Sequence, residues 1–268
     1  MIDAAELSTL GLAEVRQRVG SVENEETLLG WSRVLLADRR AGARKLGEQC
    51  VRRISARRAS REHLQKLLRR REELWANGVR VVAGVDEVGV GPLAGPVVAA
   101  AVVLPERVEI YGLNDSKQLS RTARERLSAQ IREHCVGFGI GSVEPVEIDR
   151  LNIYHAALEA MRRAVEEIRA ICPVEHLFVD ARTVPGVSLP QTSIIHGDAS
   201  EASIAAASIV AKVHRDELMV RYDEVHRGYG FGQHMGYGTE AHVRALQELG
   251  PSPIHRRSFA PVAAAARR

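Results

Sequence analysis

The spacing of apolar residues changes near residue 76, and this change constrains the fold more than any other feature of the sequence. Before it, apolar residues recur at steps of three and four, as in residues 27–36 and 64–75. This spacing is typical of amphipathic helices, and Asn77-Gly78 is a stop signal for the second one. We therefore expect a helical, arginine-rich extension over residues 1–75 and a separate α/β domain over residues 76–268.

The second part of the chain alternates between strand-like and helix-like patterns. Residues 80–85 and 97–104 are β-branched apolar runs joined by a Gly/Pro turn, which predicts a hairpin. Further strands are predicted over residues 136–143, 176–180 and 192–195, and helices over residues 146–171, 203–222 and 239–249. A hairpin followed by alternating helices and strands predicts a mixed sheet with helices packed on it.

Charge is distributed very unevenly along the chain, although the net charge is only +3. Residues 39–71 carry 13 basic and 2 acidic side chains, whereas the segments before and after this basic block are each net negative. A block of this density attracts polyanions by releasing condensed counterions, which favours contact with nucleic acid. The alternative is a solvated helical face, and the charge pattern alone does not decide between the two.

Several classes of protein are disfavoured. The three cysteines lie far apart without a C-x-x-C pair, which argues against a disulfide scaffold and a cysteine zinc site. The N-terminus lacks a basic start followed by an apolar block, so we expect no signal peptide. The uncharged stretch over residues 88–105 is interrupted by Pro92 and Pro96 and is better explained as a turn between strands. We expect a cytoplasmic monomer without membrane contact.

Acidic residues follow three of the predicted strands. They are Asp86-Glu87, Asp180 and Asp198. Carboxylates at the ends of buried strands are costly without a counter-charge, and a hard divalent cation such as Mg²⁺ or Mn²⁺ is the natural compensation. Two such ions suit in-line displacement at a phosphodiester. For any one of these acids, a turn or helix cap is the competing explanation.

Six segments resemble, in the same order, those of ribonuclease HII, the bacterial type 2 ribonuclease H. They are VDEVGVGPLAGP at 85–96, LNDSKQLS at 113–120, FVDA at 178–181, GDA at 197–199 with AAASIVAK at 205–212, GYGT at 236–239 and HRRSF at 255–259. The resemblance implies a ribonuclease H-like fold. It also implies metal-dependent hydrolysis 5′ to a ribonucleotide, in an RNA–DNA hybrid or in duplex DNA, leaving 3′-hydroxyl and 5′-phosphate ends.

The resemblance also assigns roles to particular residues. The family's metal-binding carboxylates match Asp86, Glu87, Asp180 and Asp198. Gly89, Val90 and Gly91 match the glycine loop that touches the ribose 2′-hydroxyl, where the missing Cβ permits close approach. Tyr237 matches the tyrosine that reads the ribonucleotide–deoxyribonucleotide junction, although a tyrosine between two glycines could also be a plain turn residue. Lys117 matches a lysine that binds substrate phosphate.

Other positions leave more than one interpretation open. Ser208 and Lys212 lie one helical turn apart and could hold a phosphate oxygen, but Lys212 could equally just solvate its helix. Val90, His196 and Met235 stand where the family usually has basic residues, which predicts retained chemistry with a weaker hold on the substrate. Two alternative functions remain open for the chain as a whole. It could be another metal nuclease of the same fold class, or a non-catalytic nucleic-acid-binding protein.

Overall fold

The computed structural model describes residues 4–267, and all regular structure in residues 4–76 is helical, as the apolar spacing predicts. The chain divides into two compact units, residues 1–65 and 66–268. The division expected at residues 75/76 falls ten residues after this boundary, at the end of the last of these helices, and stays a prediction. Residues 1–3 lie outside the described part. The helices are η1 (Ala4–Ser8), α1 (Leu12–Ser21), α2 (Glu25–Leu36) and α3 (Ala41–Ala76).

Residues 1–65 have an apolar core of their own. Buried side chains come from η1 and from all three α-helices of this unit, with Trp31 of α2 among them. Helix α2 begins where the Asn24 side chain accepts a hydrogen bond from the Thr27 N–H at 2.9 Å. These helices therefore associate through a shared apolar face.

Many arginines of the basic block form hydrogen bonds or ion pairs with other residues of the first unit. Arg40 pairs with Asp38 and donates to the Leu7 and Leu10 carbonyls. The side chains of Arg53 and Arg57 also donate to main-chain carbonyls, and Arg58 and Arg61 share Glu25. Part of the block thus stabilises its own helices, and its grip on nucleic acid stays a prediction.

The second unit is built on a five-stranded mixed sheet with the order β3-β2-β1-β4-β5. The β1–β2 hairpin is antiparallel, as expected, and β2 pairs antiparallel with β3, whereas β1–β4 and β4–β5 are parallel. Because β1, β4 and β5 are parallel, their carboxyl ends meet at one edge of the sheet. The strands are β1 (Val82–Val88), β2 (Val97–Val103), β3 (Gly137–Val143), β4 (His176–Asp180) and β5 (Gln191–Ile194).

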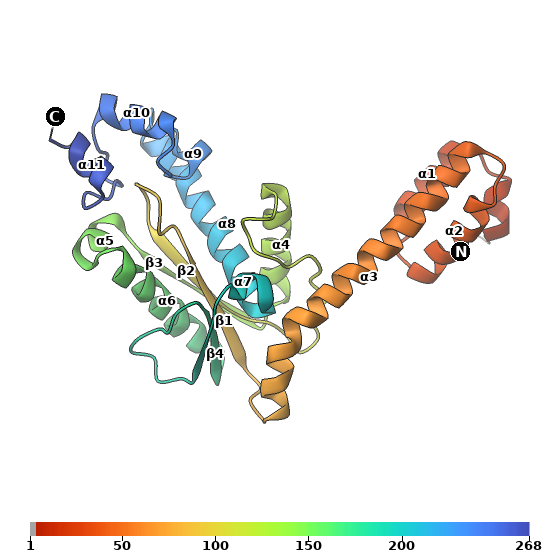
Figure 1. Cartoon of the computed structure of the whole chain (residues 1–268), viewed down its shortest axis with the longest axis horizontal. Coiled ribbons are helices and arrows are strands. Elements are labelled where there is room, and N and C mark those ends of the chain that lie inside the picture. Colours follow the sequence, from red (N-terminus) through yellow and green to blue (C-terminus); the bar gives the residue numbers. More distant parts are fainter. Residues whose placement is uncertain (1–3, 268) are drawn as a thin grey trace. The chain divides into compact units, whose positions relative to one another are not determined.

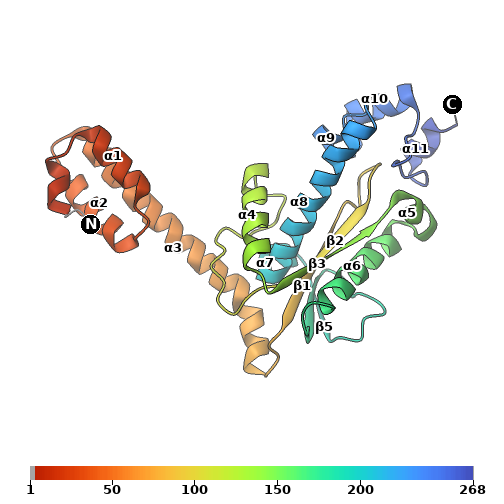
Figure 2. The same cartoon turned by 180° about the vertical axis from the view of Figure 1, so that it is seen from behind.

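Helices cover both faces of this sheet (Figures 1 and 2). Helix α6 (Ile153–Arg169) packs against β2 and β3, and α8 (Ala202–Val225) packs against β1 and β2. A Cβ on Gly84 of β1 would lie 2.1 Å from the Ser203 main chain, so α8 approaches the strand at backbone distance. The small residues at the start of α8 allow this approach, as the sequence predicts.

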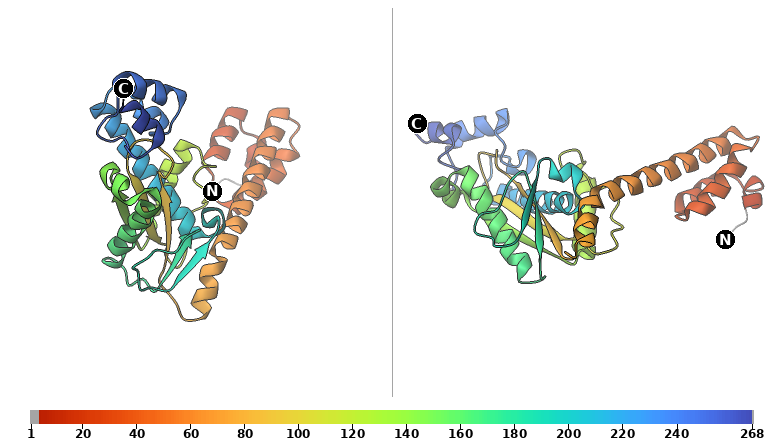
Figure 3. Two further views of the ribbon diagram at one scale, coloured as in Figure 1. Left: turned by 60° about the vertical axis from the view of Figure 1, so that its left-hand side comes forward. Right: turned by 60° about the horizontal axis from the view of Figure 1, so that its bottom comes forward.

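The remaining helices lie around this core. Figure 3 shows α9, α10 and α11 gathered beyond one end of the sheet. No helix of the described residues is both long and apolar enough to cross a membrane. The remaining helices are α4 (Arg121–His134), α5 (Pro145–Leu151), α7 (Gly197–Ser200), α9 (Phe231–His234), α10 (Glu240–Leu249) and α11 (Ala260–Ala265).

The single helix expected over residues 146–171 is wrong. The structure has two helices, α5 and α6, separated at Asn152, which adopts a positive φ of 66°. This backbone conformation cannot continue a right-handed helix. The Asn152 side chain instead accepts hydrogen bonds from the Tyr154 and His155 N–H groups and begins α6.

Candidate active site

The structure brings the four predicted acids to one edge of the sheet. Asp86 and Glu87 lie near the end of β1, and Asp180 is the last residue of the neighbouring parallel strand β4. Asp198 lies in α7, and the preceding Gly197 N–H donates to Asp180 Oδ1 at 2.7 Å. Three separate segments of chain thus supply carboxylates to the same place.

These carboxylates destabilise one another in their charged forms. Burial raises the pKa of Asp86 well above its usual value, and the charges of Glu87 and Asp180 raise it further. Burial also raises the pKa of Glu87, while Arg182 lowers it. For Asp198, burial raises the pKa, and Asp115 and Asp180 add to the effect.

The donor chemistry of the cluster suits a hard divalent cation. All four side chains offer oxygen atoms, and Glu87 Oε2 is buried with no hydrogen-bond partner within residues 4–267. Within those same residues, no three His, Cys, Asp or Glu side chains stand in a ready-made metal-binding group. The carboxylates are therefore near enough to repel one another but would have to move closer together to share a cation.

A loop over residues 89–96, between β1 and β2, is held by two fully buried arginines. Arg215 of α8 donates to the Pro96, Ala94 and Met235 carbonyls at 2.9–3.1 Å. Arg256 donates to four carbonyls, and the shortest of these bonds reaches Gly89 at 2.6 Å. The loop carbonyls are thereby fixed toward the protein interior.

Gly89 is required at the start of this loop. Its φ is +90°, and a Cβ there would lie 2.3 Å from Arg215 Nε. Any other residue would therefore be strained and would collide with the buried guanidinium. The glycine permits both the turn and the close approach of the arginine that holds the loop.

Tyr237 lies against the glycine loop. A Cβ on Gly91 would be 3.8 Å from the ring carbon Cε1 of Tyr237. Tyr237 is 42% exposed. The turn that carries it is joined to the loop, because the Leu93 N–H donates to the Gly236 carbonyl at 2.8 Å. The two segments predicted to read the ribose are thus adjacent, with part of the ring open to a ligand.

Buried histidines support the Tyr237 turn from behind. His242 Nδ1 lies 2.9 Å from the Tyr237 carbonyl, and its Nε2 lies 3.0 Å from Nε2 of His255. His234 Nδ1 accepts a hydrogen bond from the Gly236 N–H at 3.2 Å. Both His242 and His255 are almost fully buried, so they are structural residues rather than surface ones.

The other predicted contact residues have different surroundings. The charge of Lys117 lowers the pKa of both Glu87 and Asp198. Ser208 lowers the pKa of Asp86, and its hydroxyl lies 2.9 Å from that of Ser116.

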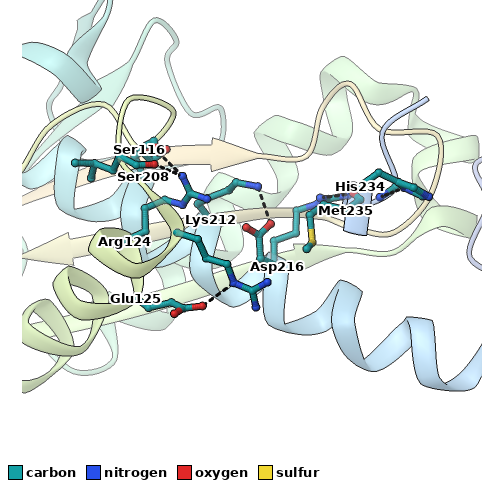
Figure 4. Close-up of polar contacts among 12 residues, drawn as sticks. Ser116, Arg124, Glu125, Ser208, Lys212, Asp216, His234 and Met235 are labelled. Carbon is teal, nitrogen blue, oxygen red and sulfur yellow. Dashed lines mark hydrogen bonds and ion pairs between the residues drawn. The ribbon is translucent and has the colours of Figure 1, made fainter. Parts of the chain in front are cut away.

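Lys212 is engaged within its own helix. Its Nζ donates to Asp216 Oδ1 at 2.6 Å, and Asp216 lies one turn further along α8 than Lys212 (Figure 4). This ion pair accounts for the side chain without substrate. Its part in phosphate binding, like the roles of Lys117 and Ser208, stays a prediction.

The three positions without their usual basic residue have main-chain roles. Val90 packs on the sheet core, and its carbonyl accepts from Arg256 at 3.1 Å. Met235 adopts a positive φ of 52°, and its carbonyl accepts from Arg215. His196 is exposed and also has a positive φ of 55°.

Sequence reasoning missed four residues of this region. Asp115 lies within the segment LNDSKQLS but received no role from the sequence. Arg256 in HRRSF could face phosphate or cap the C-terminal end, and its bonds to the loop carbonyls were not predicted. Arg215 and Arg182 belong to no quoted segment. The only signal for Arg182 was its position two residues after Asp180.

Comparisons with known proteins find one family repeatedly. The family described as Ribonuclease HII matches residues 83–262. A ribonuclease HII of Anaeromyxobacter sp. (strain Fw109-5) is 49% identical over 258 residues, covering 96% of this chain and 81% of that protein. One of Desulfitobacterium hafniense (strain Y51) is 46% identical over 256 residues, or 96% of each. The solved ribonuclease H2 from Pyrococcus horikoshii OT3 has a TM-score of 0.58 at 26% identity, covering 70% of this chain and 98% of that one.

Replacing Arg256 should loosen the glycine loop. Lysine cannot reach four carbonyls at once, so we expect Arg256→Lys to lower the free energy of unfolding by about 3 kcal/mol. The neighbouring exposed Arg257 supplies the control, Arg257→Lys, which should change it little. Urea unfolding of the three proteins measures the difference. Equal stability of Arg256→Lys and the unsubstituted protein would contradict this role.

The buried histidines should make stability depend on pH. Burial lowers the pKa of His255 to about 4, below its usual 6.5, with His242 adding to the effect. The unfolded chain therefore binds more protons between these values, so the stabilisation is complete above pH 6.5 and is lost as pH falls toward 4.

A comparison at two pH values isolates this contribution from that of the acids, whose raised pKa values act in the opposite direction. From pH 7 to 5, the unsubstituted protein should lose about 2 kcal/mol more than His255→Gln does. Urea unfolding at both pH values measures the two losses. Parallel losses in both proteins would show that His255 is not held neutral by the fold.

Proposed function

The chain belongs to the ribonuclease HII family, and from this premise we propose how its residues divide the work of the reaction. The protein is a hydrolase, an endonuclease that cleaves RNA in RNA–DNA hybrids with the help of a divalent metal. The proposals below concern the residues, the finer choice of substrate and the position of the cut.

Asp86, Glu87, Asp180 and Asp198 hold the metal in this proposal. The observation that carries it is the convergence of these acids, from three segments of chain, beside the glycine loop and Tyr237. Glu87 Oε2, which has no hydrogen-bond partner among residues 4–267, supports it, because a buried carboxylate oxygen without a hydrogen bond is costly. When bound, Mg²⁺ or Mn²⁺ supplies Lewis-acid stabilisation of the charge that develops during phosphodiester hydrolysis.

Other residues orient the substrate. The loop of Gly89 and Gly91 approaches the 2′-hydroxyl of one ribonucleotide, and the exposed ring of Tyr237 packs against the adjoining sugar. Lys117 contacts a backbone phosphate from beside the acids. The Ser208 hydroxyl donates to Asp86 and holds that carboxylate in place.

This arrangement favours cleavage on the 5′ side of a ribonucleotide, leaving 3′-hydroxyl and 5′-phosphate ends. The substrates then include duplex DNA with a single embedded ribonucleotide as well as hybrids. We propose that the protein acts as a cytoplasmic monomer. The adjacency of the glycine loop and Tyr237 supports recognition of one sugar rather than of a long RNA tract.

Product mapping tests the proposed cut. An end-labelled duplex with one ribonucleotide is incubated with the protein and Mg²⁺, Mn²⁺ or EDTA. We expect a single cut 5′ to the ribonucleotide in either metal and none in EDTA. Equal cleavage of an all-DNA duplex would favour another metal nuclease of the same fold. Metal-independent cleavage would overturn the proposal.

Asp86→Asn should separate stability from activity. It removes a buried charge from the repelling cluster, so we expect the metal-free protein to be at least as stable as before. The rise in melting temperature on adding Mg²⁺ should disappear, and cleavage should fall about 100-fold or more, since several kcal/mol of transition-state stabilisation are lost.

Thermal melts in EDTA and in Mg²⁺ measure the first two effects. Glu109→Gln is the control, because Glu109 pairs with Arg107 in the loop after β2, at the opposite end of the sheet from the acids. It should keep the Mg²⁺-induced rise. A full Mg²⁺-induced rise in Asp86→Asn would contradict its role as a ligand.

A further inference from the structure

Arg182 occupies an unusual position at the rim of the acid cluster. It follows Asp180 by two residues, across Ala181, whose positive φ of 49° turns the chain directly after β4. Its Nη2 lies 3.5 Å from Glu87 Oε1, and its guanidinium carbon lies 5.1 Å from the centre of the Tyr154 ring. The residue thus bridges the end of β4, the end of β1 and the start of α6.

The hydrogen-bonding capacity of Arg182 is largely unused. At 3.5 Å, the contact with Glu87 is longer than a normal N–H···O hydrogen bond. Its Nη1 is buried and has no hydrogen-bond partner in the described part of the chain. Arg215 and Arg256, by contrast, direct their guanidinium groups to main-chain carbonyls. A guanidinium built only to neutralise Glu87 would be expected to close on it with two short bonds.

The surroundings of Arg182 suit an anionic ligand that its planar guanidinium can bind. Tyr154 is 55% exposed and carries the guanidinium on its ring face, which fixes the plane of the group. The planar fork of arginine matches the oxygens of a phosphate, and 25% of the Arg182 side chain is open to solvent. An exposed aromatic ring beside an arginine is also the combination that contacts a nucleic-acid strand.

We propose that Arg182 binds a backbone phosphate of the nucleic-acid substrate next to the cleaved bond, and that Tyr154 is the positioning residue that holds its guanidinium. This inference rests on the proposed function, because it takes the nearby acids to be the place of cleavage. It adds a cationic contact that is separate from the glycine loop and from Lys117.

Salt-dependent binding tests the contact without relying on turnover. The probe is a fluorescent RNA–DNA hybrid, titrated in EDTA at several KCl concentrations. Arg182→Ala loses one phosphate contact, so it should bind the hybrid about tenfold more weakly than the unsubstituted protein. Its slope of log Kd against log salt should be smaller by about one. Arg182→Lys should restore the slope, since it keeps the charge, while remaining weaker than arginine because it lacks the fork.

Arg107→Ala is the matched control. Arg107 is also paired with a glutamate, Glu109, and lies beyond the opposite end of the sheet. It should bind the hybrid like the unsubstituted protein. Tyr154→Leu should weaken binding less than Arg182→Ala does and leave the salt slope unchanged, because the guanidinium remains but is less ordered.

Steady-state cleavage in Mg²⁺ separates this role from a structural one. We expect Arg182→Ala to raise KM about tenfold and to change kcat no more than about threefold. An unchanged Kd and salt slope would overturn the proposal, even if kcat fell, because the guanidinium would then serve Glu87 alone. If Arg182→Ala does not fold, Arg182→Gln supplies the same comparison. Failure of the unsubstituted protein to cleave the hybrid would overturn the proposed function instead.

Discussion

Mutual repulsion among buried carboxylates is the constraint around which this unit is arranged. The parallel pairing of β1 with β4 places Asp86 and Glu87 beside Asp180, and the Gly197 hydrogen bond brings Asp198 to the same edge. Burial makes the repulsion stronger, because few water molecules remain to screen it. Bound cations would relieve this repulsion most directly. The stability of the sheet and of α8 allows the fold to tolerate it.

The glycine loop is a second part of the site, and buried side chains hold its main chain in place. The glycine loop has no polar side chains with which to anchor itself, so two buried arginines hold it by its carbonyls. The histidines behind Tyr237 perform the same task for the adjoining turn. Rigid support of this kind suits recognition of a single hydroxyl group, for which a small displacement of the loop would remove the contact.

The sequence contains enough to predict the strands, the hairpin and the four acids, because apolar runs and the residues that end them are local signals. It did not reveal the break at Asn152, since a positive φ at one residue leaves the apolar spacing intact. The buried arginines were missed for a different reason. A charged residue is expected at the surface, and only the tertiary structure shows that loop carbonyls surround Arg215 and Arg256. For the same reason, the Asp216 partner of Lys212 and the carbonyl partners of Arg53 and Arg57 became visible only in the structure.

The location of bound metal tests the central claim most directly. Crystals of the protein with a cleavage-resistant RNA–DNA hybrid and Mn²⁺ would give anomalous diffraction peaks at the ion positions. The account predicts peaks enclosed by the carboxylates of Asp86, Glu87, Asp180 and Asp198. Peaks only at other residues, or a hybrid whose backbone lies away from these acids, would contradict it.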